Sequence, residues 1–95
     1  MQQLTLENTV QRIDNEVAET DLDGNIVLLH IEHGKYYNFN AVSSDLWSSI
    51  KTPTTIKSLV EYIYQKYDCS MEQSSDDVLS FMHELLSRNL LMILT

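Results

Sequence analysis

The chain is poor in the residues that make flexible or cross-linked structure. Among its 95 residues there are two glycines and one proline, so it cannot build a glycine-rich phosphate loop, and long flexible linkers are not expected. The single cysteine, Cys69, cannot close a disulfide within one chain, unlike the cysteines of small secreted domains. No stretch reaches the roughly 18 apolar residues of a membrane span, and residues 1–20 hold no secretory signal. These absences predict a cytoplasmic protein without a membrane partner.

Basic residues are also scarce. Six Lys and Arg side chains stand against 14 Asp and Glu, which gives a net charge of −8. Binding to a phosphate backbone relies on Lys and Arg, so we expect no nucleic-acid partner. With 43% hydrophobic and 21% charged residues the chain is apolar enough to fold. Its length predicts one domain over residues 1–95.

The hydrophobic periodicity changes near Asn40 from strand-like to helix-like, which indicates an α+β domain. Before that point, three segments have the composition or alternation of strands: Val10–Glu19, Ile26–Ile31 and Lys35–Phe39. Short runs rich in Asp, Asn and Gly, or ending in Gly, join them as hairpin turns. The sequence therefore predicts a three-stranded antiparallel meander within about residues 10–39.

Three helices are predicted between about residues 41 and 89. Asn40 is a candidate N-cap for the first, and the run Thr52-Pro53-Thr54-Thr55 ends it and caps the second. Ser74, followed three residues later by Asp77, resembles a capping box for a third helix that ends near Arg88.

The third helix has an apolar face of roughly 160°, wider than a core-facing stripe needs. The closing segment 90–94 could cover part of this face, or part could serve a partner. Both remain open. We assign one line of the face to the core, namely Val78, Phe81 and Leu85. The flanking line, which we expect to form an adaptable wall for a peptide, comprises Leu79, Met82, His83 and Leu86.

No catalytic or metal-binding set is visible. His30 and His33 would leave opposite faces of a strand and its turn, whereas metal pairs share a face or a tight loop. Cys69 has little nearby to activate its thiol apart from Lys66. The acidic residues within 14–23 lack the pattern of a calcium loop. We therefore expect no metal, no cofactor and no enzyme activity.

The run Tyr36-Tyr37-Asn38-Phe39 lies on the last strand of the meander, whose outer edge is unpaired unless something covers it. Only Lys35 is the kind of residue that protects natural edges, so this edge suits the addition of an extended peptide as a further strand. Because side chains alternate, we expect Tyr37 to share the core-facing side of Phe39 and Tyr36 to point the other way. The candidate peptide-binding residues are Tyr36, Tyr37, Asn38, Phe39, Leu79, Met82, His83 and Leu86.

Several short motifs, spread from about Val17 to Ile93, together resemble the PqqD-like family. They are Asp21-Leu22-Asp23-Gly24, Leu28-Leu29, Gly34-Lys35-Tyr36-Tyr37-Asn38, Leu46-Trp47, Tyr67-Asp68, Val78, Phe81-Met82 and Leu85. Many relatives have Gly at the end of the last helix, where this chain has Asn89, which can also adopt a left-handed C-cap. Lasso-type relatives often carry a Cys early in the third helix, where this chain has Ser74 or Ser75.

The resemblance implies a winged helix-turn-helix domain of three strands followed by three helices. Such domains bind the leader segment of a ribosomally made precursor peptide, which adds antiparallel to the third strand. The aromatic run is most similar to stand-alone members from lasso-peptide pathways. Their implied partners are a lasso precursor and the cysteine protease that removes its leader, with the ring-closing cyclase as a further candidate. The alternatives are a leader-binding chaperone of another pathway, such as pyrroloquinoline quinone synthesis, and, less favoured, a DNA-binding winged-helix regulator.

Overall fold

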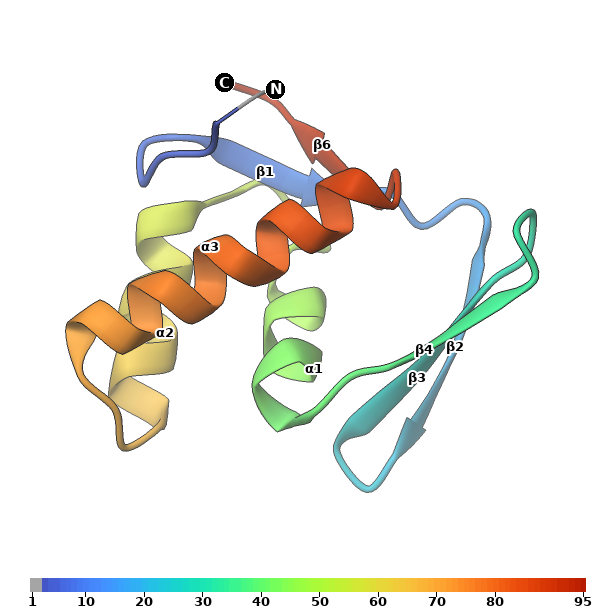
Figure 1. Cartoon of the computed structure of the whole chain (residues 1–95), viewed down its shortest axis with the longest axis horizontal. Helices are drawn as coiled ribbons and strands as arrows, with labels where there is room; N and C mark the ends of the chain where they lie inside the picture. Colours follow the sequence, from blue (N-terminus) through green and yellow to red (C-terminus); the bar gives the residue numbers. More distant parts are fainter. Residues whose placement is uncertain (1–2) are drawn as a thin grey trace.

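The computed structural model describes residues 3–95, so residues 1 and 2 of the predicted 1–95 domain lie outside the described part. Within these residues the chain forms two small sheets and three helices (Figure 1). The elements in chain order are β1 (Thr9–Arg12), β2 (Val17–Leu22), β3 (Asn25–His30), β4 (Lys35–Asn38), α1 (Ala41–Ser49), β5 (Thr54–Thr55), α2 (Ile56–Lys66), α3 (Met71–Ser87) and β6 (Leu91–Ile93).

The predicted α+β class and antiparallel meander are confirmed, with strand order β2-β3-β4. The turn between β2 and β3 holds Asp23 and Gly24 at φ values of 57° and 91°, the left-handed region that the Asp-Gly pair favours. The Asp21 carboxylate closes this turn by accepting a hydrogen bond from the Gly24 N–H at 2.7 Å.

The prediction of one continuous strand over Val10–Glu19 is wrong. This segment divides into β1 and β2, and β1 belongs to a second antiparallel sheet of order β5-β1-β6. This sheet lies beside the two chain ends (Figure 1). After β1, the Ile13 N–H donates to the Leu90 carbonyl at 2.9 Å, so this part of the chain stays with the C-terminal segment. The predicted three-stranded sheet followed by three helices is confirmed, and the second sheet adds β5 before α2 and β6 after α3.

The first two helices begin at their predicted caps. The side chain of Asn40 accepts from the Ser43 N–H, and that of Thr55 accepts from the Ser58 N–H. No helix within residues 3–95 combines the length and the apolar character needed to cross a membrane.

The third helix begins one turn earlier than predicted. Ser70 is the N-cap, and its hydroxyl accepts from the Gln73 N–H at 3.0 Å. Ser74 lies inside the helix, fully buried, and donates to the Val60 carbonyl of α2 at 2.7 Å. The capping-box interpretation of Ser74 is thus wrong, because its hydroxyl ties two helices together instead of capping one.

The three predicted core residues of α3, namely Val78, Phe81 and Leu85, are buried as expected. Phe81 meets Phe39 edge to face with ring centroids 5.2 Å apart, which joins α3 to the segment after β4. Asn89 ends the helix in the left-handed conformation with φ 60°, as the Asn-for-Gly replacement predicts. Beyond it, Leu90 and Leu91 are buried, so the closing segment contributes to the core.

Candidate functional site

Strand β4 is the last strand of its sheet, and no strand within residues 3–95 pairs with its outer edge. The Phe39 N–H donates to the Ile26 carbonyl at 2.9 Å, which fixes the phase of hydrogen bonding between β3 and β4. Because bonding alternates along an antiparallel pair, Tyr37 directs its N–H and C=O toward β3. The same groups of Tyr36 and Asn38 point to the open edge. The strand therefore offers two donors and two acceptors to another strand.

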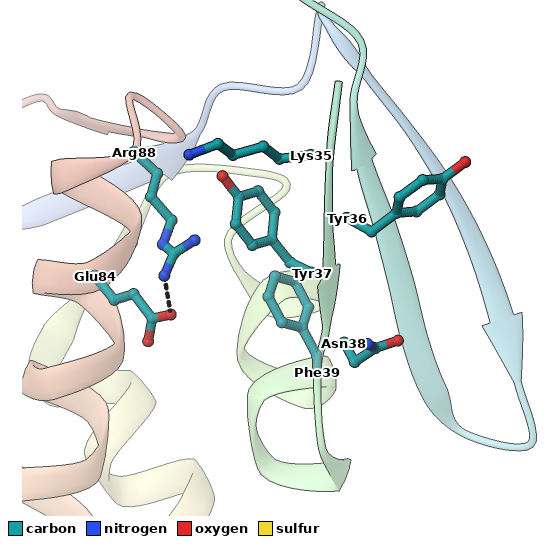
Figure 2. Close-up of a pocket in the computed structure, with 7 residues that line it drawn as sticks. All are labelled: Lys35, Tyr36, Tyr37, Asn38, Phe39, Glu84 and Arg88. Atoms are coloured by element: carbon teal, nitrogen blue, oxygen red, sulfur yellow. Dashed lines mark ion pairs between the residues drawn. The ribbon is translucent and has the colours of Figure 1, made fainter. Parts of the chain in front are cut away.

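The side chains of β4 alternate as predicted. Tyr37 is half-buried on the side facing α3, whereas Tyr36 is 68% exposed and points away from the helix (Figure 2). Phe39 is buried in the core and Asn38 is exposed. The structure thus places the four predicted strand residues together, with only Tyr37 and Phe39 directed toward the helix.

A groove runs between β4 and α3, and we call it the β4–α3 groove. Its central part has a volume of about 560 Å³ and is lined by Lys35, Tyr36, Tyr37, Asn38, Phe39, Glu84 and Arg88 (Figure 2). Toward the start of α1 it adjoins a cavity of about 250 Å³ lined by Asn40, Val42, Ser43, Leu46, Asp77, Ser80, Phe81 and Glu84. Toward the end of α3 it adjoins a cavity of about 630 Å³ lined by His33, Lys35, Tyr37, Ser87, Arg88 and Asn89.

The three parts are neighbours that share lining residues. We call the cavity near the start of α1 the α1 end of the groove and the cavity near the end of α3 its α3 end. Glu84 lines both the central part and the α1 end. Lys35, Tyr37 and Arg88 line both the central part and the α3 end. The guanidinium carbon of Arg88 lies 4.3 Å from the centroid of the Tyr37 ring. The Arg88 guanidinium also pairs with the Glu84 carboxylate at 3.0 Å. One arginine therefore contacts both walls of the groove.

The helix face predicted to line the cleft is not the one that faces β4. None of Leu79, Met82, His83 and Leu86 lines the β4–α3 groove. Met82 has no exposed surface, so it belongs to the core and cannot form an accessible wall. Leu79 and Leu86 are half-buried and pack against the core.

The residues of α3 that do line the groove were missed because most of them are polar. They are Asp77, Ser80, Phe81, Glu84 and Ser87, with Arg88 directly after the helix, and they recur at the spacing of three and four that defines one helix face. A search for apolar residues selects only Phe81 from this set. The available signal was the Glu84–Arg88 pair at i and i+4, which marks a polar face beside the core line.

The groove contains groups for binding and shows no assembled catalytic pair. His33 and Ser87 line the same cavity, but the Ser87 hydroxyl donates to the Glu84 carbonyl at 2.8 Å. The His33 ring stacks on the buried His30 ring with centroids 4.1 Å apart. Within residues 3–95, no group of three His, Cys, Asp or Glu side chains could hold a metal ion.

Comparison with known proteins identifies the family. The sequence profile described as Coenzyme PQQ synthesis protein D (PqqD) matches residues 25–91, which is more than half of the chain. The chain belongs to the PqqD family. This match begins with β3, and so it contains β4, α3 and the whole lining of the β4–α3 groove.

Two solved structures have the same fold as this PqqD-family chain. The first, described as TbiB1 in complex with the TbiA(beta) leader peptide, is 27% identical, has a TM-score of 0.75, and covers 85% of this chain and 94% of its own. The second, lasso peptide synthetase B1 complexed with the leader peptide, is 13% identical with a TM-score of 0.75, and covers 87% of this chain and 96% of its own. No curated protein sequence matches the chain.

Proposed function

We propose that this PqqD-family protein binds the leader segment of a ribosomally synthesised precursor peptide, without catalysing a reaction itself. The observation that carries the proposal is the open edge of β4, which lies beside a groove whose central part has a volume of about 560 Å³. The similar TbiB1 structure contains a leader peptide, which supports the same class of ligand for this chain.

Binding would use two kinds of contact. The outward N–H and C=O groups of Tyr36 and Asn38 would bond to the main chain of the leader, which gives affinity with little dependence on sequence. Alternate side chains of the added strand would then enter the β4–α3 groove and provide selectivity. Tyr37 and Phe39 supply the strand wall for these side chains.

The bound leader would be presented to the enzymes that mature the precursor. In a lasso-peptide pathway these are the protease that removes the leader and the cyclase that closes the ring. The aromatic run Tyr36-Tyr37, which is most similar to stand-alone lasso-type members, favours this pathway over pyrroloquinoline quinone synthesis. A DNA-binding role is disfavoured because Asp77 and Glu84 of α3 would repel phosphates.

Calorimetry with the leader and core halves of the precursor encoded beside the gene tests the proposal. We expect the leader half to bind with a negative heat-capacity change and the core half not to bind. Equal affinity for both halves, or none for either, would refute leader binding.

The mode of binding is tested by a pair of variants at one exposed position. Tyr36→Pro removes an outward N–H donor and should weaken leader binding at least about tenfold, because proline cannot donate to a new strand. Tyr36→Ala keeps that N–H and is the matched control. If both variants bind as the wild type does, the leader does not add to β4.

A further inference from the structure

The β4–α3 groove is charged in opposite senses at its two ends. Lys35 and Arg88, two of the six basic side chains of this acidic chain, line its α3 end. Asp77 and Glu84 line its α1 end. A side chain bound at the α3 end would therefore meet positive charge from both walls, since Lys35 comes from β4 and Arg88 directly follows α3 (Figure 2).

The positive charge at this end is available to a ligand. Among the residues that the structure describes, no carboxylate lies within ion-pair distance of the Lys35 ammonium. Arg88 is paired with Glu84, but the two side chains are 37% and 52% exposed, and such pairs are weak enough to exchange partners. An incoming carboxylate can thus bind Lys35 directly and share Arg88.

The C-terminal end of a helix carries partial negative charge, which at the C-terminus of α3 would oppose an acidic ligand. At the end of α3 that charge is largely satisfied. The Leu85 carbonyl accepts from the N–H groups of Arg88 and Leu90, and the Leu86 carbonyl accepts from that of Asn89. Lys35, which has no acidic partner among the described residues, therefore dominates the field at this end, and Arg88 adds to it when an incoming carboxylate replaces Glu84.

The opposite end offers some apolar surface between polar side chains. The cavity of about 250 Å³ has the buried residues Leu46 and Phe81 and the half-buried Val42 among its lining. A bound aliphatic side chain would cover the apolar part of this lining.

The register of an added strand connects the two ends. A strand antiparallel to β4 places on the groove side the residues that lie opposite Phe39, Tyr37 and Lys35. The residue opposite Phe39 lies near the cavity at the start of α1, and the residue opposite Lys35 follows it by four positions toward the C-terminus. A parallel strand would reverse this order.

From this charge pattern and register we infer that the protein selects a segment with an apolar side chain followed four residues later by Asp or Glu. Lys35 and Arg88 would read the acidic side chain. The inference rests on the proposed function, because it specifies the peptide that the β4 edge accepts.

Selection from a displayed library of random dodecapeptides tests it without knowledge of the natural precursor. On the wild-type protein, the enriched peptides should share an acidic residue four positions after an apolar one. On Lys35→Glu, the enriched residue at that position should change to Lys or Arg. Lys57→Glu makes the same charge change on an exposed part of α2 and should leave the wild-type preference unchanged.

Binding of one synthetic enriched peptide then measures the size of the effect. Replacing its acidic residue with Gln should weaken binding about tenfold, as expected for the loss of a charge-assisted hydrogen bond. Replacing it with Lys should weaken binding further on the wild type but restore it on Lys35→Glu.

The possible results separate the two claims. If no peptide is enriched and the leader half also fails to bind in calorimetry, the proposed function falls and this inference falls with it. If peptides are enriched without an acidic preference, with the reverse order, or without a change on Lys35→Glu, the selectivity inference is wrong although peptide binding stands.

Discussion

The Arg88 guanidinium stacks on the ring of Tyr37, with its central carbon 4.3 Å from the ring centroid. Tyr37 belongs to β4 and Arg88 directly follows α3, so this contact spans the groove between the two elements. A planar guanidinium can stack and still use its edge for an ion pair, here with the Glu84 carboxylate at 3.0 Å. The pair therefore fixes the spacing of the two walls and keeps donors available in the groove.

Removing this contact should affect binding more than folding. Arg88→Ala is expected to lower the free energy of unfolding by only about 0.5–1 kcal/mol, because the cation–π pair is partly exposed. It should weaken leader affinity about tenfold, since it removes both a wall and a positive charge. Urea denaturation and calorimetry measure the two effects. A loss of stability with full leader affinity would show that Arg88 serves only the fold.

The start of α3 gives a prediction about stability alone. Ser70→Ala removes the N-cap and should lower the free energy of unfolding by about 1 kcal/mol. Ser75→Ala, in the second turn of the same helix, should change it by less than about 0.5 kcal/mol. Urea denaturation of both variants measures the difference. Equal effects would contradict the assignment of Ser70 as the cap.

This helix start shows where sequence reasoning succeeds and where it fails. Asn40 and Thr55 each precede an apolar stripe directly, so their capping role is visible in local sequence. Ser70 and Ser74 are both plausible caps from local sequence. The choice depends on the Val60 carbonyl, which only the packing of α2 against α3 brings to the Ser74 hydroxyl. Local pattern cannot contain that information.

The same limit applies to the candidate site. The unpaired edge of β4 and the opposite directions of Tyr36 and Tyr37 follow from strand order and alternation, which a sequence does encode. The face of α3 that meets β4 depends on the rotation of the helix about its own axis. That rotation is set by core contacts such as Phe81 with Phe39, and it brings the polar Glu84 and not the apolar Met82 to the groove.

Acid stability should depend on Asp45, which lies outside the groove. Burial alone would raise the pKa of the Asp45 carboxyl. The carboxylate, however, accepts a hydrogen bond from the Tyr67 hydroxyl and pairs with the Lys66 ammonium at 2.9 Å. These two contacts outweigh burial and lower the pKa of Asp45 below its ordinary value of 3.8. A carboxylate with a lowered folded-state pKa adds stability above its unfolded-state pKa, and this stability is lost as the pH falls through the folded-state value.

Thermal melts of the wild type and Asp45→Asn between pH 2 and pH 7 measure this effect. The wild type should melt higher at pH 6–7, and the difference should shrink below about pH 4. Asp68→Asn changes an exposed carboxylate and is the matched control, which should follow the wild type throughout. A constant difference between wild type and Asp45→Asn over the whole range would contradict the role of the ionised carboxylate.

The face of α3 that contacts the leader can be identified with two variants on opposite sides of the helix. Ser80 is exposed and lines the α1 end of the groove, so Ser80→Trp should fill the space for the leader side chain and weaken binding at least about tenfold. Leu86 lies outside the groove lining, so Leu86→Glu should keep leader affinity provided that circular dichroism shows a native fold. Met82→Glu would bury a charge in the core and should unfold the domain. If Leu86→Glu abolishes binding while Ser80→Trp preserves it, the leader lies on the apolar flank of α3 and the β4–α3 groove is not its site.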